Sequence, residues 1–246
     1  MRVAVITDLH ANLPALEAVL EAAEAAAVEE TWCLGDVVGY GVEPDACADL
    51  VRERCDVCLV GNHDLAVLGA LDISSFSEAA AVAVEWTRDN VHERTLEFLR
   101  TLEPSGEREG IGLFHASPRD PVWEYVLSRE QANAGMDSHP LRIGLIGHSH
   151  VALFFNRPEG GESGETRGGQ AGDGALLDLG RGGWLVNPGS VGQPRDGDPR
   201  AAWLELDTDA ETACFRRVPY EIAMAAGPIA AAGLPQRLAD RLHIGQ

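Results

Sequence analysis

Short apolar segments typical of buried strands alternate with helical segments over residues 1–60. Apolar residues in the helical segments recur at helical spacing, as Leu16, Val19 and Leu20 do. The expected strands are residues 2–7, 31–34 and 57–60, and the expected helices are residues 14–30 and 44–54. This strand–helix–strand rhythm predicts an α/β fold with a mostly parallel sheet, whose strand ends carry the functional site.

The remainder of the chain is richer in strands than in helices. Its expected strands are residues 111–114, 143–146, 151–155, 176–179, 184–186, 202–206 and 214–218. Residues 77–102 predict one or two helices, which either cap a site or form an outer helical layer. The glycine-rich residues 157–174 predict a long mobile hairpin loop, and residues 234–242 predict a surface helix. With 246 residues, 45% of them hydrophobic, we expect a single domain over residues 1–246.

The charge balance excludes several kinds of chemistry. The chain has 39 acidic and 19 basic residues, and every basic residue is an arginine. Without lysine there is no phosphate-loop lysine, no Schiff-base lysine and no lysine general base, and arginine stays protonated. The formal net charge of −20 disfavours long nucleic acids and anionic membranes as partners, although much of it can equally serve solubility. A small anionic substrate stays compatible if bound metals reverse the local charge.

Other global features favour a cytoplasmic protein. The first apolar run is too short for a signal peptide, and no segment approaches the roughly 18 apolar residues of a membrane span. The five cysteines include one C-x-x-C pair, Cys55 and Cys58, but no second pair stands at zinc-ribbon spacing. We interpret the cysteines as small buried hydrophobic residues. The sequence does not indicate an oligomeric state.

Polar clusters follow five of the expected strands at the point where each strand ends. Such strand ends converge on one edge of a sheet, and residues i and i+2 of an extended chain share a face. The clusters are Asp8-Leu9-His10, Gly35-Asp36, Gly61-Asn62-His63-Asp64, His115 and Gly147-His148-Ser149-His150. Carboxylate, imidazole and amide oxygen form a mixed ligand set that suits Mn, Fe, Zn or Ni. Each cluster alone is a weak signal, but the ordered set predicts a metal site.

The ordered clusters resemble those of the calcineurin-like metallophosphoesterase superfamily. The chain is most similar to its small single-domain prokaryotic members, which share three further features. These are the Asp8–Leu16 pattern, the motif Gly35–Gly41, and the late segment Asn187–Arg195. The resemblance reaches from residue 1 to about residue 220 and omits the glycine-rich loop. It implies two packed mixed β-sheets flanked by helices, a sandwich that some schemes class as α+β.

The resemblance also implies two divalent metal ions, with manganese favoured. In this family pattern Asp8, His10 and His150 bind the first metal, and Asp36 bridges both. The second metal is bound by Asn62, His115 and His148. Two metals roughly 3.5–4 Å apart hold a bridging hydroxide, which attacks phosphorus in line while the metals neutralise phosphoryl oxygens.

His63 resembles the family imidazole that protonates the leaving oxygen. Asp64 either orients His63 or caps the loop. Asn12, Tyr40 and Arg195 are candidate substrate contacts, and Arg195 suits bidentate phosphate recognition, although each can instead serve loop structure or a surface ion pair. Trp86, Trp123 and Tyr125 are candidates for base stacking or for core packing. We interpret the remaining histidines, His92, His139 and His243, as structural or solvated.

These features predict a metal-dependent phosphoric ester hydrolase. Its expected substrate is a small phosphomonoester or phosphodiester, nucleotides included. The alternatives are a phosphoprotein phosphatase or a dinucleoside-polyphosphate hydrolase. A non-catalytic scaffold on the same fold is the third hypothesis, and it is disfavoured because His63 and all seven ligand positions are intact.

Overall fold

Two six-stranded mixed sheets form the centre of the molecule in the computed structural model. It describes the backbone of residues 1–246 and every side chain except that of Ser163. The first sheet has the order β3 (Val57–Cys58), β2 (Glu30–Cys33), β1 (Arg2–Ile6), β11 (Ala201–Asp207), β12 (Thr212–Val218) and β9 (Leu176–Asp178). The second has the order β4 (Ser105–Arg108), β5 (Ile111–Phe114), β6 (Ile143–Leu145), β10 (Gly183–Asn187), β7 (Leu153–Arg157) and β8 (Arg167–Gln170).

The two sheets pack against each other through one apolar layer. Alternate side chains of each strand point to opposite faces, so Val3 and Val5 of β1 enter this layer together with Leu113 of β5 and Val186 of β10. The opposite face of β1 packs under α1 (Leu13–Ala25) and α2 (Pro44–Arg54). The outer face of the second sheet packs against α6 (Arg129–Ser138). The sandwich that the family resemblance implies is therefore present.

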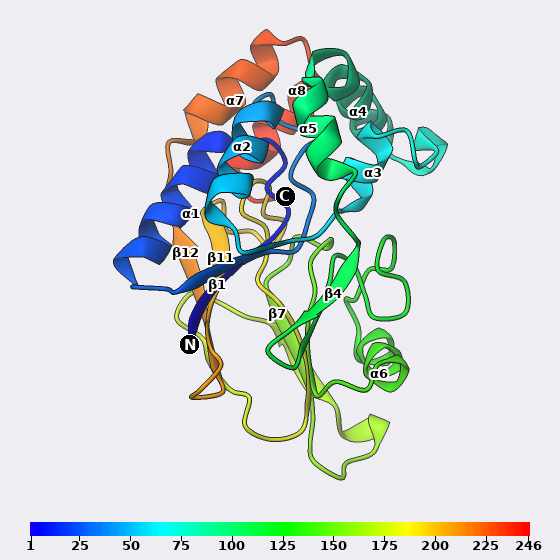
Figure 1. Cartoon of the computed structure of the whole chain (residues 1–246), viewed down its shortest axis with the longest axis vertical. Coiled ribbons are helices and arrows are strands. Elements are labelled where there is room, and N and C mark those ends of the chain that lie inside the picture. The colour runs from blue at the N-terminus through cyan, green and yellow to red at the C-terminus, as the bar shows by residue number, and fades with distance from the viewer.

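The remaining helices gather at one end of the sandwich. They are α3 (Asn62–Val67), α4 (Glu78–Asn90), α5 (Glu93–Leu99), α7 (Ile222–Ala231) and α8 (Gln236–Asp240). Three short 3-10 turns complete the element order: η1 (Ile73–Ser75), η2 (Ser163–Glu165) and η3 (Arg241–His243). Figure 1 shows α1, α2, α4, α5, α7 and α8 together above the sheets, with α6 near the opposite end. No described helix is long and apolar enough to cross a membrane.

Several expected elements differ from the structure. The first sheet is parallel only from β1 to β3, because β11, β12 and β9 join it antiparallel. Residues 77–102 form two helices, α4 and α5. The glycine-rich residues 157–174 are not all loop: β8 pairs with β7 as an edge strand. The C-terminal helix α8 is shorter than expected. It buries Leu238 and Ala239 in a small core, to which the following turn η3 adds Leu242, so it is not simply a surface helix.

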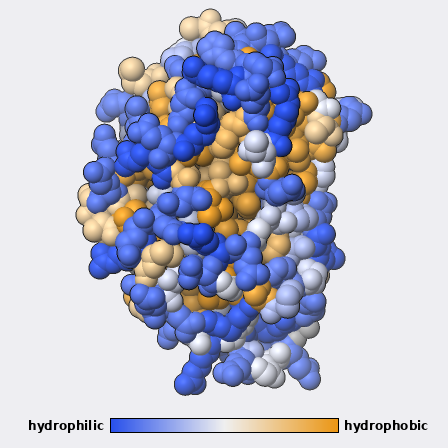
Figure 2. Space-filling view, viewed as in Figure 1, coloured by the Kyte–Doolittle hydropathy of each residue, from blue (hydrophilic) through white to orange (hydrophobic). Residues whose placement is uncertain are grey.

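The outer surface matches the acidic composition. Figure 2 shows hydrophilic side chains around the margins of one face and apolar side chains gathered in its middle. Arginine–carboxylate pairs are spread over the exterior, such as Arg94 with Asp49 and Arg142 with Glu211. Exposed pairs of this kind contribute about 0–1 kcal/mol each, so the stability of the fold rests on the apolar layers.

Candidate metal centre

The seven predicted ligand residues converge where the strands of both sheets end. Asp8 and His10 follow β1, Asp36 follows β2 and Asn62 follows β3 in the first sheet. The second sheet supplies His115 after β5 and both His148 and His150 after β6. All seven side chains are buried, with at most 4% of the surface of each exposed. The packing of the two sheets therefore brings together five segments that lie far apart in the sequence.

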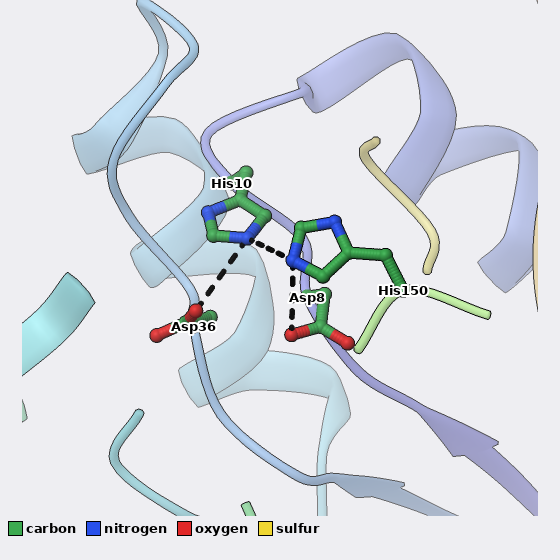
Figure 3. A group of neighbouring side chains, drawn as sticks. All are labelled: Asp8, His10, Asp36 and His150. Carbon is green, nitrogen blue, oxygen red and sulfur yellow. Dashed lines mark hydrogen bonds and ion pairs between the residues drawn. The ribbon is translucent and has the colours of Figure 1, made fainter. Parts of the chain in front are cut away.

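One half of the centre consists of Asp8, His10, Asp36 and His150, whose ligand atoms all lie within 4.8 Å of one another. Figure 3 shows the four side chains pointing toward a common point. His10 Nε2 lies 3.1 Å from His150 Nε2 and 3.5 Å from Asp36 Oδ2. His150 Nε2 lies 3.6 Å from Asp8 Oδ1.

The tautomers of these two histidines make the arrangement suitable for a cation. His10 Nδ1 lies 3.2 Å from the carbonyl oxygen of Val38, and His150 Nδ1 lies 2.8 Å from that of Gln193. A carbonyl oxygen only accepts, so each Nδ1 carries the proton and each Nε2 presents a lone pair. Two lone pairs facing each other at 3.1 Å repel in the absence of a cation. These residues therefore fit a divalent metal.

The second half of the centre contains Asp36, His115 and His148, whose ligand atoms also lie within 4.8 Å of one another. His115 Nδ1 donates to the carbonyl oxygen of Leu34 at 3.0 Å, so its Nε2 presents a lone pair to Asn62 Oδ1 at 3.1 Å. Among the described residues, Asp36 Oδ2 and His148 Nε2 are buried without a hydrogen-bond partner. Buried polar atoms are normally paired, so these orphaned atoms also fit a metal.

Asp36 belongs to both halves of the centre. Its Oδ2 lies 3.5 Å from His10 Nε2 on one side and 3.6 Å from His115 Nε2 on the other. Its second oxygen, Oδ1, accepts the backbone N–H of His63 at 2.9 Å, which fixes the orientation of the carboxylate. A single carboxylate between two ligand groups is the arrangement that a bridging ligand needs.

The backbone at the ligands is held in an uncommon conformation. Asp8, His10, Asp36, His148 and His150 all have positive φ angles, between 50° and 63°. Non-glycine residues rarely adopt this region, and each instance costs about 1–3 kcal/mol. Hydrogen bonds between the loops offset this strain, since Asp8 N donates to Gly35 O and His10 N donates to Asp36 O. Strain at so many ligand positions is typical of a functional site.

Burial controls the ionisation of the centre. It raises the pKa of Asp8 to about 7 and, together with the charge of Asp64, raises that of Asp36 well above its usual range. It lowers the pKa of His148 to about 2 and those of His10 and His150 well below their usual value. The histidines are therefore neutral, which is the form that binds metals. A bound cation favours the ionised carboxylates and so opposes the effect of burial.

The structure places His63 beside the ligands and gives Asp64 a separate set of contacts. The ring of His63 contacts those of His10 and Tyr40, with centroids 4.9 and 4.3 Å apart. Its Nδ1 is buried and has no hydrogen-bond partner in the described part of the chain. The Asp64 carboxylate instead accepts three backbone N–H groups, from Val37, Val38 and Gly61. These contacts favour the capping alternative for Asp64.

The three candidate substrate contacts lie in different settings. Asn12 is turned into the fold: it accepts the N–H of Ala15 at the start of α1 and donates to Gly192 O. Tyr40 packs its ring on His10, and Arg195 donates to the hydroxyl of Tyr40 at 3.3 Å. Tyr40 and Arg195 therefore adjoin the centre, whereas the side chain of Asn12 is occupied by structural hydrogen bonds.

Sequence reasoning did not predict a role for Gln193, and it left two alternatives for Tyr125 and Trp123. The carbonyl of Gln193 orients His150, and its position inside the segment Asn187–Arg195 was the available signal. Tyr125 is 42% exposed, and its ring stacks on His148 with the centroids 4.1 Å apart, so it is not a core residue. Trp123 contacts Phe76, which in turn contacts His63. Tyr125 and Phe76 therefore contact His148 and His63 directly, whereas the Trp123 ring contacts Phe76.

Comparisons with known proteins agree with this geometry. The family model of the calcineurin-like phosphoesterase superfamily domain matches residues 1–209. The uncharacterized protein MJ0912 of Methanocaldococcus jannaschii is 34% identical over 255 residues, covering 99% of this chain and 98% of that protein. The crystal structure of a metallophosphoesterase from Sphaerobacter thermophilus is similar with a TM-score of 0.90 and 38% identity, covering 100% of this chain and 99% of that one. The hypothetical protein PH1004 from Pyrococcus horikoshii OT3 shares the fold with a TM-score of 0.78 and 20% identity, covering 100% and 98%. The chain belongs to the calcineurin-like phosphoesterase superfamily.

Proposed function

We propose that this protein hydrolyses a small phosphomonoester or phosphodiester, nucleotides included, with two divalent metal ions. The observation that carries the proposal is the position of Asp36 between two groups of buried ligands whose ring nitrogens face one another. Asp8, His10 and His150 would hold the first metal, and Asn62, His115 and His148 the second. When bound, the two metals supply an activated water and neutralise the phosphoryl oxygens. Manganese is the metal that we favour.

The protein's own residues have three tasks in this reaction. The carbonyls of Val38, Leu34 and Gln193 hold the ligand histidines in the tautomer that directs Nε2 inward. The buried setting excludes bulk water, which strengthens electrostatic interactions with the phosphate. Arg195 is placed to bind a phosphoryl oxygen through its fork of N–H groups.

His63 would give its proton to the leaving oxygen as the P–O bond breaks and water's oxygen becomes bonded to phosphorus. Burial, followed by the nearby charge of Arg195, lowers the pKa of His63 well below its usual value, so the ring is neutral in the free protein. An anionic phosphoryl group beside the ring favours its protonated form. Substrate binding would thereby raise the pKa of His63, so that the ring takes up the proton that it then donates to the leaving oxygen.

The test combines metal analysis with a substrate screen. Metal content per chain is measured by mass spectrometry after loading with Mn, Fe, Zn or Ni. Each form is then assayed with p-nitrophenyl phosphate, bis-p-nitrophenyl phosphate and a panel of nucleotides. We expect two metals per chain and turnover of at least one ester. Two bound metals with no turnover under any condition would favour the scaffold hypothesis instead.

A further inference from the structure

One ligand of the second metal depends on a surface loop. The other three ligand histidines donate Nδ1–H to carbonyl oxygens of buried residues, namely Val38, Leu34 and Gln193. At His148 the backbone of Trp123 takes this part: burial lowers the pKa of the ring to about 2, and a hydrogen bond with the Trp123 backbone opposes that effect. Trp123 is half-buried in the loop that joins β5 to α6. The orientation of His148 is therefore tied to this loop.

A second residue of the same loop contacts the His148 ring directly. The ring of Tyr125 stacks on it, with the two planes 28° apart and the centroids 4.1 Å apart. His148 also contacts His115, edge to face, with the centroids 5.3 Å apart. Stacked aromatic pairs contribute about 0.5–1.5 kcal/mol beyond the area that they bury. Tyr125 therefore supplies a face-to-face contact that limits rotation of the His148 ring.

Tyr125 also lies between His148 and the solvent. Its side chain is 42% exposed, whereas His148 beneath it is 4% exposed. An aromatic ring at the surface that stacks on a buried metal ligand covers one face of that ligand. Removal of the ring would therefore open this face of His148 to water.

The loop holds Tyr125 in place through the residues around it. Asp120 Oδ1 accepts the backbone N–H groups of the second and third residues that follow it, both at 3.1 Å. On one side of Tyr125, Glu124 pairs with Arg119. On the other side, Val126 is buried in the apolar cluster of the second sheet. The position of the Tyr125 ring is therefore set by its neighbours, although the ring itself is exposed.

The two halves of the metal centre differ in ligand charge. The first half has two carboxylates, Asp8 and Asp36, whereas the second half shares Asp36 and otherwise has the neutral ligands Asn62, His115 and His148. A divalent cation is attracted less strongly by one carboxylate than by two, so we expect the second metal to be the weaker one. A disturbance at His148 therefore acts on the metal that is lost more easily.

We propose that Tyr125 is a positioning residue for the second metal: its ring holds His148 in the orientation that binds the ion and shields this ligand from water. The proposal rests on the metal sites of the proposed function and not on the reaction. Residues that orient metal-binding histidines contribute about 10–100-fold to metal affinity. The loss of the Tyr125 ring should therefore weaken the second metal and spare the first. The hydroxyl group has no part in this role.

The test is a calorimetric titration of the metal-free protein with Mn²⁺, which measures the two binding events. Tyr125→Ala should weaken the second event about tenfold or more and change the first by less than about threefold. Tyr125→Phe keeps the stacking ring and should bind both metals as the wild type does, whereas Tyr125→Leu keeps apolar bulk without a ring face and should resemble Tyr125→Ala. Leu127→Ala is the matched control, because it removes another large exposed side chain, 54% exposed, from the same loop.

Electron paramagnetic resonance adds a readout that a purely structural role would not alter. With two Mn²⁺ added per chain, the wild type should give the signal of a spin-coupled metal pair. Tyr125→Ala should give the signals of isolated and free Mn²⁺ and should form the coupled pair only with metal in excess. Turnover of p-nitrophenyl phosphate by this variant should rise over the same range of metal concentration.

The outcomes separate this role from the proposed function. Wild-type affinity for the second metal in Tyr125→Ala, an equal loss of both metals, or a Tyr125→Phe variant as weak as Tyr125→Ala would each overturn the positioning role and leave the hydrolase proposal standing. Two bound metals without turnover would contradict the hydrolase proposal, and the titrations would still decide the role of Tyr125. Circular dichroism melts of the metal-free variants establish that they are folded.

Discussion

Gly61 offers a sharp test of the bridging position of Asp36. A methyl group added at Gly61 would lie 2.5 Å from Asp36 N and 2.6 Å from Asp36 Cγ, and closer still to Oδ1. Gly61 has φ −101° and ψ 178°, which any residue adopts, so alanine adds volume without backbone strain at its own position. The atoms that the added methyl group would meet include the backbone nitrogen of Asp36, which cannot rotate away as a side chain can. Asp36 would therefore have to move by about 1 Å to restore an ordinary van der Waals distance.

A shift of that size exceeds what a metal site tolerates. Ligand distances in metal sites hold within about 0.2 Å, so a displaced Asp36 would weaken both metal sites at once. A misplacement of about 1 Å in a reacting assembly lowers turnover by about 100-fold. The added methyl should also destabilise the fold by about 1–3 kcal/mol through overpacking.

The assay measures three quantities in Gly61→Ala: metals per chain by mass spectrometry, turnover of p-nitrophenyl phosphate, and the rise in melting temperature on metal addition. All three should fall. Gly172→Ala is the matched control, because a methyl group there meets nothing within 4 Å and the residue is exposed. A Gly61→Ala protein with two tightly bound metals and wild-type turnover would refute the assignment of Asp36 as the shared ligand.

Three further predictions address the proton donor, the ionisation of the centre and the stability of its surroundings. His63→Ala should lower turnover about 100-fold or more with metal content unchanged, whereas exposed His92→Ala should behave as wild type; unaltered turnover in His63→Ala would remove it from the acid role. Burial raises the pKa of Asp8 to about 7 and that of Asp36 well above its usual range, so metal binding below pH 7 must displace the protons of both carboxyls. Metal affinity measured by calorimetry should therefore fall by at least about tenfold per pH unit as the pH drops below 7, and a flat profile would contradict this. Arg217→Met leaves its buried partner Asp196 uncompensated and should cost about 3–5 kcal/mol in urea unfolding; a loss below about 1 kcal/mol would contradict the pairing.

Local sequence patterns predicted much of the fold. Helix α2 begins and ends where its pattern predicts, because Pro44 suits a helix start and the apolar spacing stops at Arg54. Strand β5 also occupies the expected residues, 111–114, since a short apolar run between polar residues has few alternatives. The elements that sequence reasoning missed are the short helices α3, α6 and α7 and the four-residue strand β4. Pro228 inside α7 also argues locally against a helix.

Two features of the sheets depend on strand pairing between segments and could not be predicted from local sequence patterns. The glycine-rich residues 167–170 form β8 because β7 supplies the backbone hydrogen bonds, and nothing in their side chains indicates a strand. The antiparallel addition of β11 beside β1 joins residues about 200 positions apart, which no short-range pattern encodes. The mixed character of the first sheet follows from that contact.

The sequence by itself determined the chemical types at the metal centre and their order along the chain. Each ligand follows an expected strand, so the ordered clusters and the family resemblance predicted the set Asp8, His10, Asp36, Asn62, His115, His148 and His150 without coordinates. That these residues come from the strand ends of two sheets rather than from one sheet edge was not predicted. Tertiary structure alone decided how these groups face one another. The carbonyls that set the histidine tautomers, the backbone contacts of Asp64 and the hydrogen bond from Arg241 to Gln193 all join distant segments. Their geometry depends on packing between layers, which residue order does not express.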